Sequence, residues 1–291
     1  MSQTLTGQFP VGFRRAPLSA WTQDLGGLIA WAKANDFSVL DIGNDGAEHA
    51  AEVTGAGLRL GSVDLLEWRG MLSPDAARRR EAVAKNAAYV EACAAVGPVN
   101  HFVVMLPEDP ATPPHEVFAA MVASYTDLAP VLEQAEAKIV IEGWPGPGAL
   151  CCTTDSCRAF FATCPSPALG LNYDPSHLIR MGIDPLRFLR EFSGRVFHVH
   201  AKDTELFEDE RYVYGTEQRP LFGQTPAFGG PFWRYTLPGH GVMRWKKAFA
   251  LLVETGYQGC VSVELEDAFF HGQQETEQAG LIAAKHFLAS C

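Results

Sequence analysis

The sequence predicts an α/β protein in which parallel strands alternate with helices and close into a barrel. Three observations support this fold. Eight short β-rich runs recur along the chain, segments with helical spacing of apolar residues lie between them, and 291 residues match the size of a (β/α)8 barrel. An open doubly wound sheet usually has fewer strands and often begins with a glycine-rich turn, which this sequence lacks. We therefore expect a single (β/α)8 TIM barrel domain over residues 1–291.

The strand-like runs are rich in Val, Ile, Leu and Phe, the residue types expected in strands buried on both faces. The predicted strands are 9–14, 38–44, 59–66, 101–106, 137–143, 168–174, 196–203 and 260–266. Helical periodicity is clearest over 74–96, 114–136 and 243–256.

The regular alternation is interrupted between the seventh and eighth strands. Residues 204–245 are rich in Gly, Pro and aromatic side chains, with two Trp, three Tyr and four Phe, and show no clear helical period. Long loops in compact domains are usually functional or disordered, and this aromatic content favours order. We expect an ordered active-site loop insertion, a lid or a wall of the site.

Composition limits the partners of the chain. The formal net charge is −11, which disfavours nucleic acid and anionic membranes, and no run approaches the ~20 apolar residues that cross a bilayer. The N-terminal residues lack a signal-peptide pattern, so we expect a cytoplasmic location and a small-molecule substrate. Helix-face patterns leave open whether copies of the chain form a homo-oligomer.

Seven scattered cysteines, an odd number, fit reduced thiols better than a disulfide framework. The run "CCTTDSC" (151–157) is a weak candidate for a metal site, because no second cysteine pair with zinc-type spacing occurs elsewhere.

The seventh predicted strand contains "VFHVHAKD" (196–203). Because side chains alternate between the faces of a strand, His198, His200 and Lys202 project to the same side. Buried polar groups without partners cost on the order of 1–3 kcal/mol each, so this face needs charged or polar partners.

Such partners end the neighbouring predicted strands. Glu142 ends strand five, Asp174 ends strand six and Glu264 lies near the end of strand eight. The carboxyl ends of barrel strands form the active site of this fold. Carboxylates with one imidazole are a ligand set suited to Mn²⁺, Mg²⁺ or Co²⁺ rather than to a closed thiolate zinc site, and the cation would offset the repulsion between the acids.

Each residue also has an ordinary structural interpretation. Asp174 precedes Pro175 and could cap the next helix, and His177 could be an exposed residue of its first turn. For His198, the role of a buried histidine with hydrogen-bond partners, or of a residue that contacts a metal ligand, is favoured over that of a metal ligand itself. Lys202 and Asp203 could form an ordinary salt bridge. Glu266 and Asp267 compete with Glu264, but alternation and its earlier position favour Glu264.

These motifs together resemble the sugar phosphate isomerase/epimerase superfamily, the xylose isomerase-like TIM barrels. The resemblance covers most of the chain and is carried by "VIEGW", "NYDPSHLIRMGIDP", "FHVHAKDTE", "WRYTLPGHG" and "VSVELED". Any one motif is weak, but the ordered set is specific. It implies one divalent metal ion, Mn²⁺, Mg²⁺ or Co²⁺ with Zn²⁺ as a further candidate, held by Glu142, Asp174, His200 and Glu264.

The resemblance also implies roles around the metal. Glu142 and Glu264 would be the catalytic acid/base pair, and His177 would contact substrate. The run after strand seven differs from the ketose 3-epimerases, in which an arginine closely follows the metal histidine. Lys202 and Arg234 are the cationic candidates for substrate binding here. Trp144 would stack on a sugar ring, or it simply packs within its loop.

The predicted chemistry follows from these ligands. A divalent ion that chelates a carbonyl and a neighbouring hydroxyl acidifies the intervening C–H and stabilises an enediolate, while carboxylates move the proton. We therefore expect a metal-dependent sugar isomerase or epimerase. The alternative is a lyase or hydrolase that eliminates a β leaving group from a 3-keto-glycoside or an inositol-derived keto sugar. A repair nuclease is disfavoured by the charge, and a non-catalytic sugar-binding barrel would have little use for both glutamates.

Overall fold

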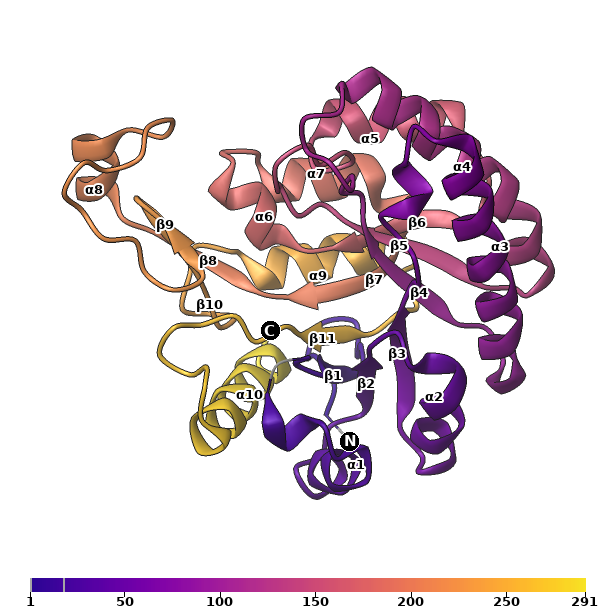
Figure 1. Cartoon of the computed structure of the whole chain (residues 1–291). Coiled ribbons are helices and arrows are strands. Elements are labelled where there is room, and N and C mark those ends of the chain that lie inside the picture. Colours follow the sequence, from indigo (N-terminus) through magenta and orange to yellow (C-terminus); the bar gives the residue numbers. More distant parts are fainter. Residues whose placement is uncertain (1, 18) are drawn as a thin grey trace.

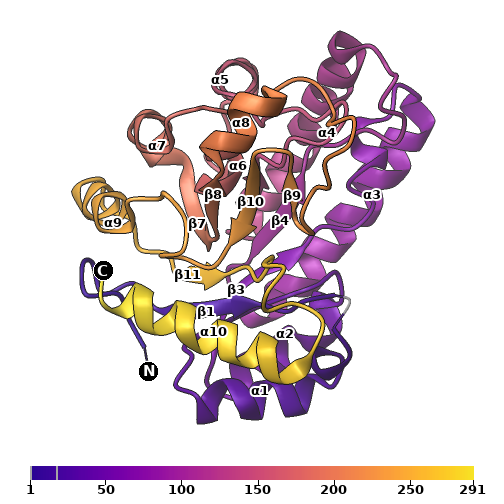
Figure 2. The same cartoon turned by 90° about the vertical axis from the view of Figure 1, so that its left-hand side faces the viewer.

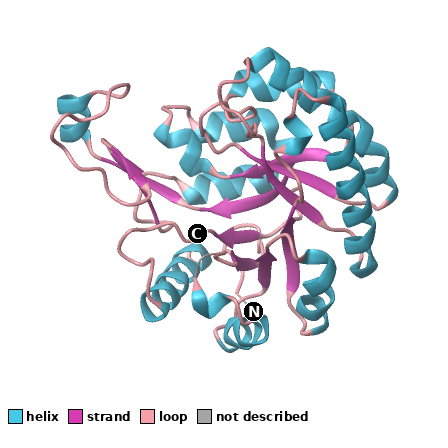
Figure 3. Cartoon of the chain, in the orientation of Figure 1, coloured by secondary structure: helices cyan, strands magenta, loops and turns pink. Residues whose placement is uncertain are grey.

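The computed structural model describes residues 2–17 and 19–291. Within these residues, strands close a barrel in the order β1-β11-β7-β6-β5-β4-β3-β2, and helices surround it (Figures 1 and 3). Every neighbouring pair of barrel strands is parallel. The predicted (β/α)8 barrel is therefore confirmed.

The observed barrel strands lie within the predicted runs, except that β4 begins one residue earlier. Their bounds are β1 (Val11–Arg14), β2 (Val39–Ile42), β3 (Arg59–Asp64), β4 (Asn100–Val104), β5 (Lys138–Glu142), β6 (Leu169–Tyr173), β7 (Val196–Ala201) and β11 (Val261–Val263).

The helices that connect these strands pack outside the barrel (Figure 3). They are α1 (Leu25–Ala34), α2 (Gly46–Gly55), α3 (Ala76–Cys93), α4 (Pro114–Gln134), α5 (Thr154–Thr163), α6 (Pro175–Arg180), α7 (Pro185–Phe192), α9 (Trp245–Glu254) and α10 (Gln274–Ala289), with short 3-10 turns η1 (Ala20–Thr22), η2 (Gly70–Leu72), η3 (Ala94–Val96) and η4 (Ser193–Arg195). Side chains of Asp24, Asp75 and Asp184 accept backbone N–H groups at the starts of α1, α3 and α7. Such caps stabilise a helix by about 1 kcal/mol each.

The predicted loop between the seventh and eighth barrel strands has more regular structure than expected. It contains β8 (Asp203–Leu206), α8 (Glu208–Tyr214), β9 (Gly229–Gly230) and β10 (Trp233–Thr236). Among the described residues, the three strands form a separate antiparallel sheet in the order β8-β10-β9, here called the rim sheet. In Figure 1 the rim sheet and α8 project from the barrel as an arm, and in Figure 2 this arm points towards the viewer. The strands of the rim sheet have two to four residues each and are too short for periodicity to reveal them.

Asp203 holds the two ends of this insertion together. Its buried carboxylate accepts hydrogen bonds from the backbone N–H groups of Thr204, Gly239 and Met243, at 2.8, 3.2 and 2.9 Å, and from the indole N–H of Trp245 at 3.1 Å. The chain therefore leaves β7 and returns to α9 at almost the same point.

Over residues 2–17 and 19–291, none of the helices combines the length and apolar composition that crossing a bilayer requires.

His101, on β4, is buried between the barrel and α3. Its side chain is inaccessible to solvent, neither ring nitrogen has a hydrogen-bond partner among the described residues, and the ring packs edge-on against Tyr89 with centroids 5.7 Å apart. Burial lowers the pKa of His101 from 6.5 to about 4.

This burial predicts a loss of stability in acid. His101 takes up a proton near pH 6.5 in the unfolded chain but only near pH 4 in the folded chain. The free energy of unfolding is therefore unaffected by the titration of His101 above pH 6.5 and decreases as the pH falls towards 4. The decrease due to His101 amounts to about 3 kcal/mol. His101→Phe, which fills the site without titrating, should flatten the free energy of unfolding over this range in urea titrations.

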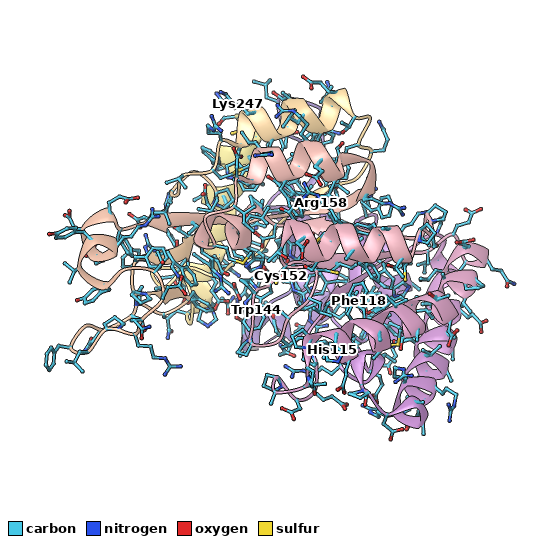
Figure 4. All side chains as sticks on the ribbon, turned by 90° about the horizontal axis from the view of Figure 1, so that it is seen from above. His115, Phe118, Trp144, Cys152, Arg158 and Lys247 are labelled. Atoms are coloured by element: carbon cyan, nitrogen blue, oxygen red, sulfur yellow. The ribbon has the colours of Figure 1, made fainter. Side chains whose placement is uncertain are left out.

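The matched control is His115→Gln, because His115 is exposed at the start of α4 (Figure 4). This variant should keep the wild-type acid dependence. An unchanged pH profile in His101→Phe would contradict the assignment.

Candidate functional site

Four of the predicted residues meet at the carboxyl ends of neighbouring barrel strands. Glu142 ends β5, Asp174 follows β6, His200 lies on β7 and Glu264 follows β11. Each offers one ligand atom, and these atoms lie within 4.8 Å of one another. The structure therefore brings together the residues predicted as metal ligands, and we call them the four-residue cluster.

Glu142 is fixed by its neighbours in the barrel. Its Oε2 accepts a hydrogen bond from the Asn172 side-chain amide at 2.8 Å and lies 2.7 Å from His200 Nδ1. Burial and the charge of Glu264 favour a raised pKa for Glu142, but the histidines His200 and His177 outweigh them and lower it below its ordinary value. The side chain is thus a carboxylate aimed at the cluster.

Asp174 caps the next helix, as one of its two interpretations predicted, and it also lies in the four-residue cluster. One carboxylate oxygen, Oδ1, caps α6 by accepting the Ser176 N–H at 2.8 Å. The other, Oδ2, is buried without a hydrogen bond in the described structure and lies 3.2 Å from Lys202 Nζ and 3.4 Å from His177 Nε2. The helix cap therefore orients the free oxygen into the cluster.

His200 presents its two ring nitrogens to different acids. Nδ1 faces Glu142, and it lies 3.6 Å from Glu264 Oε2, whereas Nε2 lies 3.3 Å from Asp41 Oδ2. The ring stacks on Phe102 with centroids 5.3 Å apart. Burial alone would lower the pKa of His200, but the charges of Glu264 and Glu142 raise it well above its ordinary value.

Lys202, the residue between β7 and β8, places its ammonium among the acids. It donates hydrogen bonds to Glu264 and, at 2.9 Å, to Glu266, and it lies over the Tyr235 ring at 4.7 Å. Burial would lower the pKa of Lys202, but Asp174 and the two glutamates raise it well above its ordinary value. Lys202 thus supplies positive charge where the carboxylates converge.

The four-residue cluster fits a divalent cation. Three carboxylates and one imidazole form the mixed O/N donor set that hard and borderline ions prefer, and the buried Asp174 Oδ2 lacks a hydrogen bond. Among the described residues, neither group with suitable ligand spacing includes a cysteine. Cys151, Cys152 and Cys157 are free and buried, so the "CCTTDSC" run gains no support as a metal site.

The other predicted residues lie at different distances from the cluster. His177 Nε2 is 3.3 Å from Glu142 Oε1, and its Nδ1 shares a 2.6 Å hydrogen bond with the Tyr235 hydroxyl. Trp144 is half-buried in the loop between β5 and α5, which also carries Cys152 (Figure 4). Arg234 instead bonds Glu205 at 2.7 Å and Asp267 at 3.1 Å. A substrate contact for Trp144 or Arg234 remains a prediction.

The rim sheet contributes Tyr235 to the surroundings of the cluster. Tyr235 of β10 is almost fully buried between His177 and Lys202, and Arg180 of α6 lies over the rings of Trp233 and Tyr235 at 4.6 and 5.5 Å. Aromatic and cationic groups therefore pack together beside the cluster, and the role of the insertion as a wall or lid stays a prediction.

Sequence reasoning missed Arg14 and Asp41. Arg14, the last residue of β1, makes two 2.8 Å hydrogen bonds to Asp64, and its Nε lies 3.4 Å from Glu264 Oε1. Asp41, on β2, lies beside His198 and His200. The signal was present, since both are charged residues within predicted strands, where a charge needs a partner.

The position of Lys202 predicts a stability that depends on metal. Lys202→Met should destabilise the metal-free protein by about 3–5 kcal/mol, because the acids lose their buried cation. Added Mn²⁺ or Co²⁺ should then raise the melting temperature more in the variant than in wild type. Thermal unfolding with and without metal measures both effects.

Lys85→Met provides the control. Lys85 pairs with Glu67 and Glu81 on the exposed side of α3, so its loss should change neither quantity appreciably. Equal metal-induced stabilisation in Lys202→Met and wild type would show that Lys202 and the metal do not neutralise the same carboxylates.

Several known proteins are similar to parts of this chain. The YfiH protein of Bacillus subtilis (strain 168) is 37% identical over 103 residues, which are 35% of this chain and 32% of that protein. An inosose dehydratase of Clostridium tetani (strain Massachusetts / E88) is 36% identical over 97 residues, 33% and 30% of the two chains. The chain thus matches about a third of the length of these curated relatives.

Solved structures match the whole barrel at low identity. The apo 3-keto-D-glucoside 4-epimerase YcjR of E. coli has a TM-score of 0.69 at 14% identity, covering 97% of this chain and all of that one. A D-psicose 3-epimerase from Clostridium cellulolyticum H10, solved with D-tagatose, has a TM-score of 0.68 at 15% identity, with coverage of 97% and 100%. The IOLI protein, solved with a zinc atom, has a TM-score of 0.64 at 18% identity, with coverage of 96% and 95%.

These neighbours share the fold, and those with named activities are enzymes that act on sugars or related compounds. The family model described as "Xylose isomerase-like TIM barrel" matches residues 24–289, and we conclude that the chain belongs to the xylose isomerase-like TIM barrel family.

Proposed function

We propose that this protein is a divalent-metal-dependent sugar isomerase or epimerase, with Glu142 and Glu264 as its acid/base pair. The observation that carries the proposal is the four-residue cluster, in which both glutamates approach one point from strands separated by β6 and β7. Two carboxylates on different sides of a bound sugar are placed to move protons at different faces or carbons of that sugar.

The cluster residues would hold the ion, with Mn²⁺, Mg²⁺ and Co²⁺ as first candidates. Zn²⁺ is supported by the zinc atom found in the structurally similar IOLI protein. When bound, such an ion would supply Lewis acidity that polarises a substrate carbonyl and acidifies the adjacent C–H.

The side chains would then carry out the proton transfers. One glutamate removes the proton beside the carbonyl, and the other returns a proton. Return to the opposite face of the same carbon gives an epimer, and return to the neighbouring carbon gives an isomer. His177 and Lys202 would hold substrate oxygens, a role supported by their burial and their contacts with cluster acids. The rim sheet would exclude water from the reacting carbons.

A lyase is the second candidate. The same proton abstraction, with a leaving group on the β carbon, would eliminate that group from a 3-keto-glycoside or an inositol-derived keto sugar. The similarity to inosose dehydratases over about a third of the chain favours this reaction, and the fold of the 3-keto-D-glucoside epimerase favours keto sugars as a substrate class. The two candidates differ in whether the product keeps all atoms of the substrate.

Solvent-deuterium exchange tests the proposal. Wild type loaded with Mn²⁺ or Co²⁺ should incorporate deuterium from solvent into one or more members of a panel of ketoses and 3-keto-glycosides. Glu264→Gln and Glu142→Gln should reduce the rate about 10²- to 10⁴-fold, because each lacks a proton-transfer group. Mass spectrometry would detect both the exchange and any loss of a leaving group.

Glu191→Gln is the matched control, because Glu191 pairs with Arg158 on the surface of α7. It should exchange like wild type. If metal binds stoichiometrically but no compound of the panel incorporates deuterium, proton transfer on these compounds is refuted. If a compound loses a leaving group, the protein is a lyase.

A further inference from the structure

A second group of buried side chains lies directly behind the four-residue cluster. Asp41, His198 and His200 are all inaccessible to solvent. Asp41 Oδ2 lies 2.9 Å from His198 Nε2 and 3.3 Å from His200 Nε2, and Cys260 Sγ lies 3.4 Å from His198 Nδ1. The proposed function uses His200 but assigns no role to Asp41.

The hydrogen positions in this chain of contacts follow from donor and acceptor chemistry. A histidine that binds a metal through Nδ1 carries its proton on Nε2, and that buried N–H needs an acceptor. His200 Nε2 has no regular hydrogen bond to any described residue, and Asp41 Oδ2 is the carboxylate oxygen beside it. His198 donates its own Nε2–H to the same oxygen, which leaves its Nδ1 to accept from the Cys260 thiol.

The backbone is shaped to admit this carboxylate. Asp41 lies opposite Arg14 in the parallel pairing of β1 and β2. In the barrel, β1 and β11 lie between β2 and β7, so the Asp41 side chain reaches the histidines of β7 across the barrel interior. At Gly61 on β3, an added Cβ would lie 1.9 Å from Asp41 Oδ1 and 3.1 Å from His198 Cε1. A side chain at position 61 would therefore displace Asp41 from the histidines.

We propose that Asp41 is a positioning residue of the candidate metal centre: its Oδ2 accepts the Nε2–H of His200 and so turns the Nδ1 lone pair towards Glu142 and Glu264. The inference rests on the proposed metal-dependent function, because it concerns a ligand of that same site. Carboxylates behind metal-bound histidines fix the orientation and basicity of the ring, and their loss usually lowers metal affinity about 10- to 100-fold.

The same three residues also satisfy the spacing of a metal-binding group. The short contact between His198 Nε2 and Asp41 Oδ2 favours hydrogen bonding instead, since an N–H donated to a carboxylate accounts for it without an ion. One bound metal per chain is therefore expected, at the four-residue cluster.

Metal affinity tests this role separately from catalysis. We would titrate wild type, Asp41→Asn and Ser262→Ala with Co²⁺ and follow calorimetry and the visible absorption of the bound ion. Asp41→Asn should weaken binding about 10- to 100-fold and change the absorption spectrum. Ser262, buried on β11 in register with His200, has a hydroxyl without a hydrogen bond in the described structure, so Ser262→Ala should bind like wild type.

A measurement on wild type covers the case in which Asp41→Asn does not fold. Long-range ¹H–¹⁵N correlation spectra of the Zn²⁺-loaded protein should show His200 protonated at Nε2 and metal-bound at Nδ1. Coordination through Nε2 would overturn the inference, as would equal Co²⁺ affinity in wild type and folded Asp41→Asn.

The remaining outcomes separate this inference from the function. Two Co²⁺ ions per wild-type chain with one lost in Asp41→Asn would make Asp41 a ligand, which also overturns it. Absence of Co²⁺ binding by wild type would overturn both proposals. A wild type that binds Co²⁺ without catalysing deuterium exchange would overturn the proposed function for the substrates tried, and the affinity comparison would then decide the inference alone.

Discussion

The organisation of the barrel mouth depends on the neutralisation of crowded acids. Glu142, Asp174 and Glu264 converge within a few ångströms, and mutual repulsion in a buried site would separate them or keep them protonated. Lys202 and His200 lie in direct contact with them, and Arg14 lies beside Glu264. Positive charge at this point is therefore a condition of the fold, and a metal ion would satisfy the same condition.

Much of the barrel and of the four-residue cluster could be predicted from local patterns. Period-two alternation in "VFHVHAKD" placed His198, His200 and Lys202 on one face, and the order of parallel strands placed Glu142 and Asp174 at the same rim. These inferences succeed because the side-chain direction in a strand and the common polarity of parallel strands are fixed by backbone geometry. They require no knowledge of which distant residues touch.

The features that sequence reasoning missed depend on such distant contacts. Asp41 meets His198 across 157 positions of sequence, and Arg14 meets Glu264 across the closure of the barrel. The rim sheet likewise pairs β8 with β10 about 30 residues later, although neither strand exceeds four residues. Arg234 on β10 bonds Glu205 and Asp267, partners that no local pattern indicated, and its substrate contact stays a prediction. Closure of the barrel, rather than any local pattern, determines these partners.

The hydrogen bonds of Asp203 determine which part of the insertion can vary in length and sequence. The Asp203 carboxylate binds both ends of the insertion, at the exit from β7 and at the start of α9. The two ends of the insertion are therefore held at fixed positions. The entropic cost of closing a longer loop grows only slowly with its length. The part of the arm between β8 and β10 is therefore an exchangeable module: its length and surface can diverge while the register of the barrel, and with it the reacting centre, stays the same.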